Sequence, residues 1–234
     1  LAKTNKAVIP GFYGSMPNGT IKTFSRGGSD VTGSIVARAA KAKLYENWTD
    51  VSGCLICDPR IVNNPEPIKT ITYRELRELA YMGATVLHED AIFPVRAAGI
   101  PVNIKNTNQP EDRGTMIVSE SAEHCDHIIT GIAGKKGMSV INIEKDKMNS
   151  EIGFGKNVLR ALEKSNVSFE HMPSGVDTMS VVIATEALAG KETAIIDEIK
   201  SRVHPDQIYI ESNLALIAVV GRVQEVQRQS YLQL

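Results

Sequence analysis

The 234-residue chain is long enough for one large domain or two small ones, and a hydrophobic fraction of 42% supports ordinary buried cores. Lys and Arg (26) nearly balance Asp and Glu (27) without a dense basic run, which argues against nucleic acid or anionic lipid as a partner. No apolar stretch approaches the roughly 20 residues of a membrane span and no secretory signal opens the chain, so we expect a cytoplasmic protein with a small-molecule partner.

The first section alternates predicted strands with predicted helices. A short strand at Thr20 to Phe24 leads through a Gly-rich loop into a helix, and a second helix begins at a capping box, Thr72-Tyr73-Arg74-Glu75, and carries an apolar stripe as far as Leu87. Further strands are predicted at Leu44 to Trp48, Pro101 to Lys105 and Thr115 to Val118. This alternation predicts a three-layer α/β sandwich with a largely parallel sheet.

A different rhythm begins after the polar stretch Ser119 to Asp126, where we place a domain boundary. The elements beyond it follow the order strand, helix, strand, strand, helix, strand, which is the ferredoxin-like arrangement. They are strands at Met138 to Ile143, Val167 to His171, Thr178 to Ala184 and Gln207 to Ile210, with helices at Gly155 to Ser165 and Lys191 to Val203. Leu214 to Val220 predicts one further apolar strand.

The cysteines predict reduced thiols, because Cys54, Cys57 and Cys125 lack the spacing of a disulfide framework. Cys54-Leu55-Ile56-Cys57 matches half of a redox or zinc motif, but no second pair exists, and we interpret the stretch as a buried strand. His124-Cys125-Asp126-His127 contains metal-ligating residue types in the predicted boundary loop. We predict no metal site in the protein itself.

The Gly27-Gly28 turn presents backbone N–H groups at the positive end of a helix, which suits a carboxylate or a phosphate. Arg26 adds a bidentate donor, and Asp30 suits a substrate ammonium. The loop thus carries the complementary charges of an amino acid zwitterion. Gly-rich turns beside a charge are also common as purely structural features, so the loop alone leaves both interpretations open.

Thr49-Asp50 follows the predicted strand that ends at Trp48, and Asp58-Pro59-Arg60 lies shortly beyond it. Strand ends in such sheets line the ligand crevice. A hydroxyl, a carboxylate and a guanidinium there suit the parts of a nucleotide, because phosphoryl transfer depends mainly on positioning and charge neutralisation. For either piece alone, a capped turn with a surface ion pair is the alternative.

Taken together, these pieces form a far more specific pattern. In chain order the sequence carries Pro10-Gly11-Phe12-Tyr13-Gly14, Ser25-Arg26-Gly27-Gly28-Ser29-Asp30, Trp48-Thr49-Asp50-Val51, Asp58-Pro59-Arg60 and Gly83-Ala84-Thr85-Val86-Leu87-His88. This series closely resembles consecutive motifs of aspartate kinases, and the resemblance covers most of residues 7 to 220. It implies transfer of the γ-phosphoryl group of ATP, with Mg²⁺, to the side-chain carboxylate of L-aspartate, the first step of lysine, threonine and methionine biosynthesis.

The resemblance also implies roles for individual residues. Arg26 and Asp30 match residues that grip the aspartate carboxylate and amine, with Asp30 assigned to the catalytic site and with Gly28 and Ser29 beside them. The implied nucleotide contacts are Thr49, Asp50, Leu55, Arg60 and Thr85.

Two of these residues depart from the family pattern. Thr85 stands where a phosphate-facing Lys is usual and supplies no positive charge, and Leu55 stands where an aromatic residue is common. The family's N-terminal Lys-Phe-Gly-Gly segment lies before Leu1, so we expect this polypeptide by itself to have no measurable aspartate kinase activity.

The resemblance extends to the second half, which is similar to the ACT domains that bind amino acids between paired copies. The implied division assigns residues 1–120 to the C-terminal part of the amino-acid-kinase catalytic domain and residues 121–137 to a linker and the first strand of a second ACT module, with that strand at His127 to Ala133. Residues 138–211 form the first ACT domain and residues 212–234 an incomplete second module.

An effector site is implied at the start of the helix predicted from Gly155. Its residues are Met148, Gly153 and Phe154, whose loop faces an effector carboxylate, together with Glu170 and Ser174. The implied effector is lysine, acting as inhibitor in a homodimer or tetramer, with Glu170 pairing with an ammonium group. The alternative is that Gly153-Phe154-Gly155 is only a turn with a core Phe.

Two other hypotheses stay open beside aspartate kinase. One is another amino-acid kinase, such as a glutamate or carbamate kinase, with a different acceptor. The other is a non-enzymatic amino-acid sensor built on ACT domains, which would bind effector but no nucleotide. The order of the motifs and the ACT-like second half favour aspartate kinase.

Overall fold

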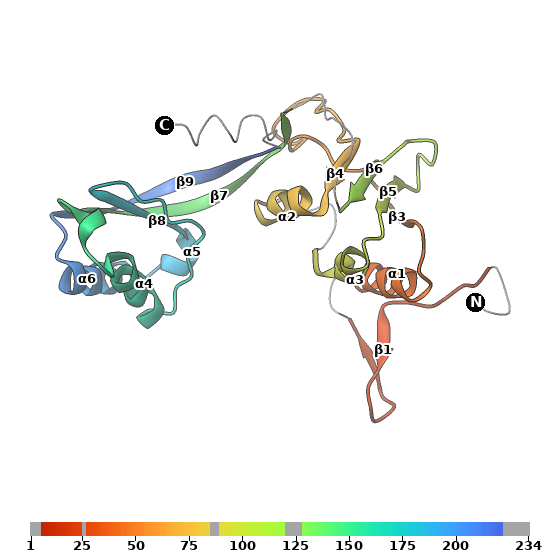
Figure 1. Ribbon diagram of the computed structural model, residues 1–234, viewed down its shortest axis with the longest axis horizontal. Coiled ribbons are helices and arrows are strands. Elements are labelled where there is room, and N and C mark those ends of the chain that lie inside the picture. The colour runs from red at the N-terminus through yellow and green to blue at the C-terminus, as the bar shows by residue number, and fades with distance from the viewer. Residues whose placement is uncertain (1–5, 25–26, 85–88, 120–127, 222–234) are drawn as a thin grey trace. The chain divides into compact units, whose positions relative to one another are not determined.

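The computed structural model describes residues 6–24, 27–84, 89–119 and 128–221. It divides into two compact units, one made of residues 1–134 with residues 217–234 and the other of residues 135–216 (Figure 1). Within the described ranges, no helix has the length and apolar character needed to cross a membrane. The predicted domain boundaries remain predictions.

The first unit contains a four-stranded sheet in the order β3-β5-β6-β4. β3 (Tyr45–Thr49) pairs parallel with β5 (Val102–Asn106), and β4 (Thr70–Thr72) pairs parallel with β6 (Thr115–Val118). The central β5–β6 pair is antiparallel. The sheet is therefore mixed, with two parallel pairs of the three. The α/β class is confirmed, and the three-layer arrangement stays a prediction.

Helices and a hairpin accompany this sheet. β1 (Tyr13–Ser15) and β2 (Ile21–Thr23) form an antiparallel hairpin that leads into α1 (Gly28–Ala39). α1 packs against α3 (Phe93–Ala97) and the preceding short helix η1 (Glu89–Ile92). At this contact the buried Ser34 hydroxyl accepts a hydrogen bond from the Val95 backbone N–H at 3.3 Å.

The predicted capping box is confirmed at the start of α2 (Tyr73–Tyr81). The Thr72 hydroxyl accepts from the Glu75 backbone N–H, while the Glu75 carboxylate accepts from the Thr72 N–H at 2.9 Å. The same carboxylate, which is buried, accepts from the Thr130 hydroxyl at 2.6 Å. α2 ends earlier than predicted, at Tyr81, and Val86 and Leu87 lie outside the described residues.

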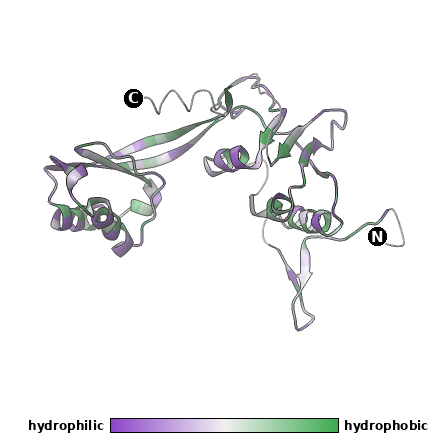
Figure 2. Cartoon of the chain, in the orientation of Figure 1, coloured by the Kyte–Doolittle hydropathy of each residue, from purple (hydrophilic) through white to green (hydrophobic). Residues whose placement is uncertain are grey.

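The second unit holds a sheet in the order β8-β7-β9 against two helices. The strands are β7 (Ile129–Glu144), β8 (Thr178–Ala184) and β9 (Gln207–Gly221), with β7 and β9 extending past the unit's limits. The helices are α4 (Phe154–Lys164) and α6 (Glu192–Val203), with the short η2 (Met148–Ser150) and α5 (Thr185–Leu188) between strands. Figure 2 shows hydrophilic and hydrophobic residues on both long helices. Their apolar faces join Ile141, Ile143, Val181 and Ile183 in the core.

Four predicted strands were wrong in form. The strand predicted at His127 to Ala133, of which His127 lies outside the described residues, and the one at Met138 to Ile143 fall into one strand, β7, from Ile129 onward. Those at Gln207 to Ile210 and Leu214 to Val220 belong to one strand, β9. A single long strand leaves fewer backbone N–H and C=O groups without a hydrogen bond than two short strands do. The sequence did not reveal this continuity, because the residues between the apolar runs are polar or glycine and were interpreted as breaks.

Val167 to His171 does not form a regular strand. The Glu170 N–H donates to the Val182 carbonyl and the Val182 N–H donates to the His171 carbonyl, each at 2.8 Å. Two residues thus lie opposite one, which is the count of a β-bulge, and a bulge breaks the ladder on the outer side of β8. The ferredoxin-like order therefore lacks a continuous second strand.

The Cys54 to Cys57 stretch is also no strand, since among the described residues its one β-bridge joins Leu55 to Pro67. Cys54 is buried, and its burial raises the pKa of the thiol to about 12. A thiol with so high a pKa is almost entirely protonated near neutrality and is a poor nucleophile or metal ligand. The described residues include no group of three His, Cys, Asp or Glu side chains suited to a metal ion.

Candidate functional site

The predicted substrate loop begins α1. Gly27 has φ +79°, a left-handed conformation that favours glycine, and caps the helix without a side-chain hydrogen bond. A Cβ on Gly28 would lie 2.7 Å from the Phe24 Cβ and 2.8 Å from the Phe12 Cδ2. Gly27 is thus required by its backbone conformation, and Gly28 is required by close packing. Arg26 lies outside the described residues.

Asp30 lies in the first turn of α1, where a carboxylate is favoured by the helix dipole. The Asn47 side chain, on β3, donates from Nδ2 to the Asp30 Oδ1 at 2.9 Å and to the Tyr45 hydroxyl at 3.2 Å. The Tyr45 hydroxyl lies 3.4 Å from the Asp30 backbone carbonyl, to which it donates. Burial, opposed by the Asn47 hydrogen bond and reinforced by the Asp30 charge, raises the Tyr45 pKa. Ser29, beside Asp30, is exposed.

Polar side chains gather where β3 and β5 end. Because the two strands are parallel, with Thr49 opposite Asn106, their carboxyl ends meet at one edge of the sheet. The Thr107 N–H and hydroxyl both bond the Thr49 carbonyl, at 2.8 and 2.7 Å. The Thr49 hydroxyl donates to the exposed Asp50 carboxylate at 3.1 Å. We call this group of residues 49–52 and 106–108 the strand-end edge.

Ser52 joins the two sides of the strand-end edge. Its hydroxyl accepts from the Asn106 Nδ2 at 2.9 Å and donates to the Asp112 carboxylate at 2.5 Å. Lys105 donates to the Asp112 backbone carbonyl, and its ammonium lies 5.6 Å from the centroid of the Trp48 ring. These contacts hold the 106–112 segment over the end of β3.

Asp58 and Arg60 form an exposed bidentate pair. The Arg60 guanidinium donates from Nε at 3.0 Å and from its terminal nitrogen at 2.6 Å, and the Arg60 backbone N–H donates at 2.8 Å. The Arg60 side chain is 84% exposed, so one face of the guanidinium remains accessible to an anion. Leu55 is partly exposed at 37%, and Thr85 lies outside the described residues.

The described polar groups fit a nucleotide in part. Hydroxyl, amide and carboxylate groups at the strand-end edge match the hydrogen-bonding needs of a ribose and a base, and Arg60 offers a cation for a phosphate. The Asp50 carboxylate is the kind of oxygen ligand that Mg²⁺ accepts. The two predicted sets, around Asp30 and around Thr49, are both anchored on β3.

The predicted effector residues divide into core and surface members. Met148 and Phe154 are buried in the hydrophobic core of the second unit, so their side chains are structural members of that core. Gly153 has φ +86° and begins α4 without a side-chain cap. Ser174 bridges Met179 across the outer side of β8.

Glu170 is already part of an ion pair. The Lys135 ammonium of β7 lies 2.7 Å from the Glu170 Oε1, and the Glu170 side chain is only 16% exposed. An ammonium is thus bound at the position where the sequence predicted that of an effector.

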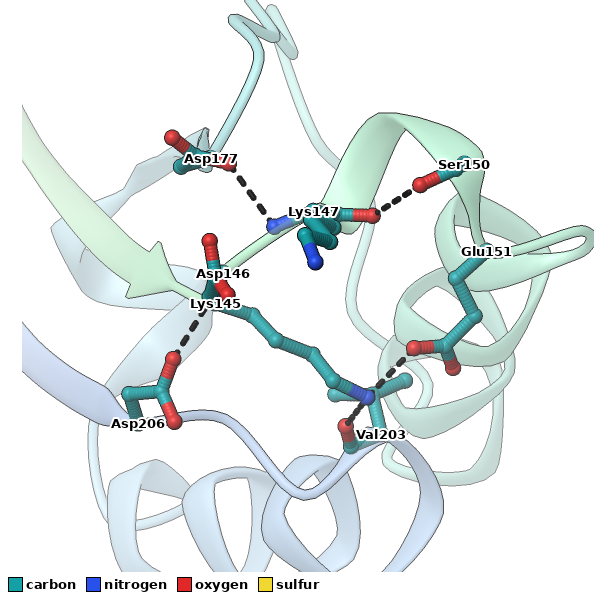
Figure 3. A network of polar contacts seen from close by, with 8 residues as sticks. All are labelled: Lys145, Asp146, Lys147, Ser150, Glu151, Asp177, Val203 and Asp206. Carbon is teal, nitrogen blue, oxygen red and sulfur yellow. Dashed lines mark hydrogen bonds and ion pairs between the residues drawn. The ribbon is translucent and has the colours of Figure 1, made fainter.

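A polar network holds the loop before α4 (Figure 3). The Lys145 ammonium donates to the Glu151 carboxylate and to the Val203 carbonyl at the end of α6, and it lies 5.8 Å from the Phe154 ring. The Lys147 N–H donates to Asp177 and the Asp146 N–H to Asp206, each at 2.8 Å. The loop geometry is therefore set by contacts with three other segments.

Sequence reasoning missed Asn47, Ser52 and Asn106. The signal for Asn47 was its alternation with Tyr45 and Thr49, which places all three on one face of a strand. The Asn47 amide is buried, and a buried amide is normally hydrogen-bonded, which indicates other polar groups nearby. Ser52 and Asn106 meet only through the parallel pairing, which no local pattern reveals.

The Asp58–Arg60 geometry yields a pH prediction. The Arg60 side chain first, and its backbone N–H second, lower the Asp58 pKa to about 2 from an ordinary value of 3.8. Arg60→Ala removes the larger cause, so the Asp58 pKa rises toward that ordinary value, and only in part because the backbone donor remains. A carboxyl-carbon NMR titration measures this change. The matched control is Arg38→Ala, at an exposed position of α1; an Asp58 pKa that stays near 2 in Arg60→Ala refutes the pairing.

Known proteins resemble this chain in sequence and in fold. A family model described as the amino acid kinase family matches residues 1–106. Aspartokinase 3 of Bacillus subtilis is 45% identical over 215 residues, which make up 92% of this chain and 47% of that protein. The crystal structure of the aspartate kinase of Clostridium acetobutylicum matches with a TM-score of 0.83 and 58% identity, covering 97% of this chain and 54% of that one.

Two solved states of Escherichia coli aspartokinase III also match. The complex with aspartate and ADP is 26% identical with a TM-score of 0.65, over 92% of this chain and 48% of that one. The complex with lysine and aspartate is 27% identical with a TM-score of 0.68, over 91% and 47%. The chain thus spans about half the length of the relatives it matches. Residues 1–106 match the amino acid kinase family, and the chain is similar to aspartokinases over most of its length.

Proposed function

We propose that this chain carries the aspartate-binding and nucleotide-binding half of an aspartate kinase, together with an amino-acid-sensing region. The observation that carries the proposal is that one strand, β3, anchors both groups: its Asn47 side chain bonds Asp30, and the strand-end edge begins where the strand ends, at Thr49. An amino acid acceptor and a phosphoryl donor need binding groups held on one rigid element, because phosphoryl transfer depends on positioning.

The proposed acceptor is L-aspartate. The Asp30 carboxylate binds the ammonium of the amino acid, and the N–H groups of Gly28 and Ser29 at the start of α1 suit its α-carboxylate. Arg26 adds a bidentate contact to the α-carboxylate of the substrate. The complex of the E. coli relative with aspartate and ADP supports both ligands.

The proposed donor is ATP with Mg²⁺. Thr49 and Asp50 contact the nucleotide from the strand-end edge, Leu55 and Thr85 complete its surroundings, and Arg60 binds a phosphate oxygen. A side-chain carboxylate oxygen of aspartate attacks the γ-phosphorus, the bond from that phosphorus to the bridging oxygen breaks, and ADP leaves with the electron pair. Asp50 would be a ligand of Mg²⁺ bound with the nucleotide, and that ion would supply positive charge against the phosphates.

Aspartate binding tests the acceptor site, and binding is preferable to turnover because the chain spans about half of its relatives. Calorimetric titration of the whole chain with aspartate should give a measurable Kd, and Asp30→Asn should raise that Kd about 10-fold or more by removing the ammonium's partner. Asp197→Asn, which makes the same change at an exposed position of α6, should leave it unchanged.

No heat with aspartate in the wild-type chain, or equal Kd values for Asp30→Asn and Asp197→Asn, would contradict the acceptor site. The expectations that the chain by itself lacks kinase activity and lies in the cytoplasm stay predictions.

For the second unit we propose regulation by lysine through ACT domains, in a homodimer or tetramer. The α4 start at Gly153, the Glu170 carboxylate and Ser174 support an amino acid effector of this class, whose ammonium would have to replace that of Lys135 at Glu170. The E. coli relative solved with lysine and aspartate supports the choice of lysine. Regulation requires that lysine favour one quaternary state over another.

Lysine should therefore bind and stabilise a dimer, while threonine and methionine bind more weakly. Calorimetry measures the affinities, and sedimentation with and without lysine measures the dimer. Glu170→Gln should weaken lysine binding by about 10-fold through loss of the charged partner, whereas Glu186→Gln, at an exposed position, serves as the matched control. Absence of heat with all three amino acids would remove the regulatory proposal, and lysine binding without any nucleotide binding would favour a pure sensor.

A further inference from the structure

Asn47 is a buried amide with 7% of its surface exposed, in the middle of the short strand β3. Neither core packing nor the sheet ladder requires an amide there, since the ladder uses only backbone groups. Its Nδ2 is shared between the Asp30 carboxylate at 2.9 Å and the Tyr45 hydroxyl at 3.2 Å. Both N–H bonds of the amide are therefore used, and both contacts lead to the proposed substrate site.

These two contacts fix the orientation of the amide. With the amide turned over, its oxygen would face the carboxylate, and two acceptors would repel each other. The Tyr45 hydroxyl accepts from Asn47 and donates to the Asp30 backbone carbonyl at 3.4 Å, so the chain of hydrogen bonds runs from Asn47 through Tyr45 to Asp30. Burial of Asn47 keeps water from competing for these contacts.

The Tyr45 ring is itself fixed by α1. A Cβ on Gly33 would lie 2.6 Å from the Tyr45 hydroxyl oxygen, so the ring lies against the bare backbone of the helix. Tyr45 and Asn47 point to the same side of β3, toward α1. β3 is thereby bonded twice to the first turn of α1: Tyr45 bonds the Asp30 backbone carbonyl, and Asn47 bonds the Asp30 carboxylate.

These hydrogen bonds leave part of the Asp30 carboxylate available to a ligand. Asn47 bonds Oδ1, and within the part of the chain that the structure describes no group donates to Oδ2. Asp30 is partly exposed, so an incoming ammonium can reach it. An aspartate side chain in a first helical turn otherwise has several rotamers, and fixing one of them reduces the ordering cost of binding.

We propose that Asn47 is a positioning residue for the proposed aspartate site, holding the Asp30 carboxylate in the rotamer that binds the substrate ammonium. The inference rests on the proposed function, because it requires that Asp30 contact that ammonium. Asn47 itself touches no substrate, and its effect passes through Asp30.

The test compares aspartate with succinate, which has both carboxylates but no ammonium. Asn47→Leu keeps the approximate volume and removes the donor, so the Kd of aspartate should rise about 10-fold while the Kd of succinate stays within about twofold of wild type. A merely structural role would weaken both ligands equally, and that outcome would overturn the inference. Asn47→Ala, which cannot overfill the site, supports the same comparison should the leucine variant fail to fold.

A double-variant cycle gives the second readout. In an Asp30→Asn background, Asn47→Leu should change the aspartate Kd by less than about twofold, because the group it positions is gone. Full additivity of the two changes would overturn the proposal. If the wild-type chain binds no aspartate, the proposed function fails and the inference falls with it; if it binds aspartate and Asn47→Leu binds equally well, only the inference fails.

Discussion

Parallel pairing of β3 with β5 is the constraint on which the candidate site depends. The register from Tyr45 opposite Val102 to Thr49 opposite Asn106 brings two strand ends to one edge, although the residues are more than 50 positions apart in the chain. Without this pairing, Ser52 and Asn106 would not meet and the 106–112 segment would have no anchor. The buried Val102 and Ile104 side chains stabilise the pairing from the core side.

The same strand also determines the geometry of the substrate loop. β3 carries Asn47 and Tyr45 on the face toward α1, and α1 accommodates the Tyr45 ring because position 33 is a glycine. At the start of the helix, Gly28 allows the close approach of Phe12 and Phe24. Gly28 and Gly33 thus allow two close contacts with α1. Between them, Asp30 is held by the side-chain amide of Asn47 on β3. The proposed acceptor and donor sites share one rigid strand, which suits a reaction governed by positioning.

The local elements could be predicted from the sequence because their signals are local. The capping box at Thr72, the helix after Gly27-Gly28 and the amphipathic α4 follow from spacing within a few residues. The continuity of β7 and β9 could not be predicted, because a strand's length depends on its partner's backbone rather than on its own apolar runs. The β-bulge at Glu170 and the ion pair with Lys135 depend likewise on register with other strands.

For the candidate site, the resemblance in motif order predicted Asp30, Thr49, Asp50 and Arg60, whereas their hydrogen-bond partners required the three-dimensional arrangement. The most direct test of the account is an amide NMR map of the whole chain with aspartate and then with Mg²⁺ and ADP. Aspartate should shift the signals of residues 27–31 and of the Asn47 side chain, and the nucleotide should shift those of residues 49–52 and 106–108. Shifts confined to residues 135–216, or none with either ligand, would contradict it.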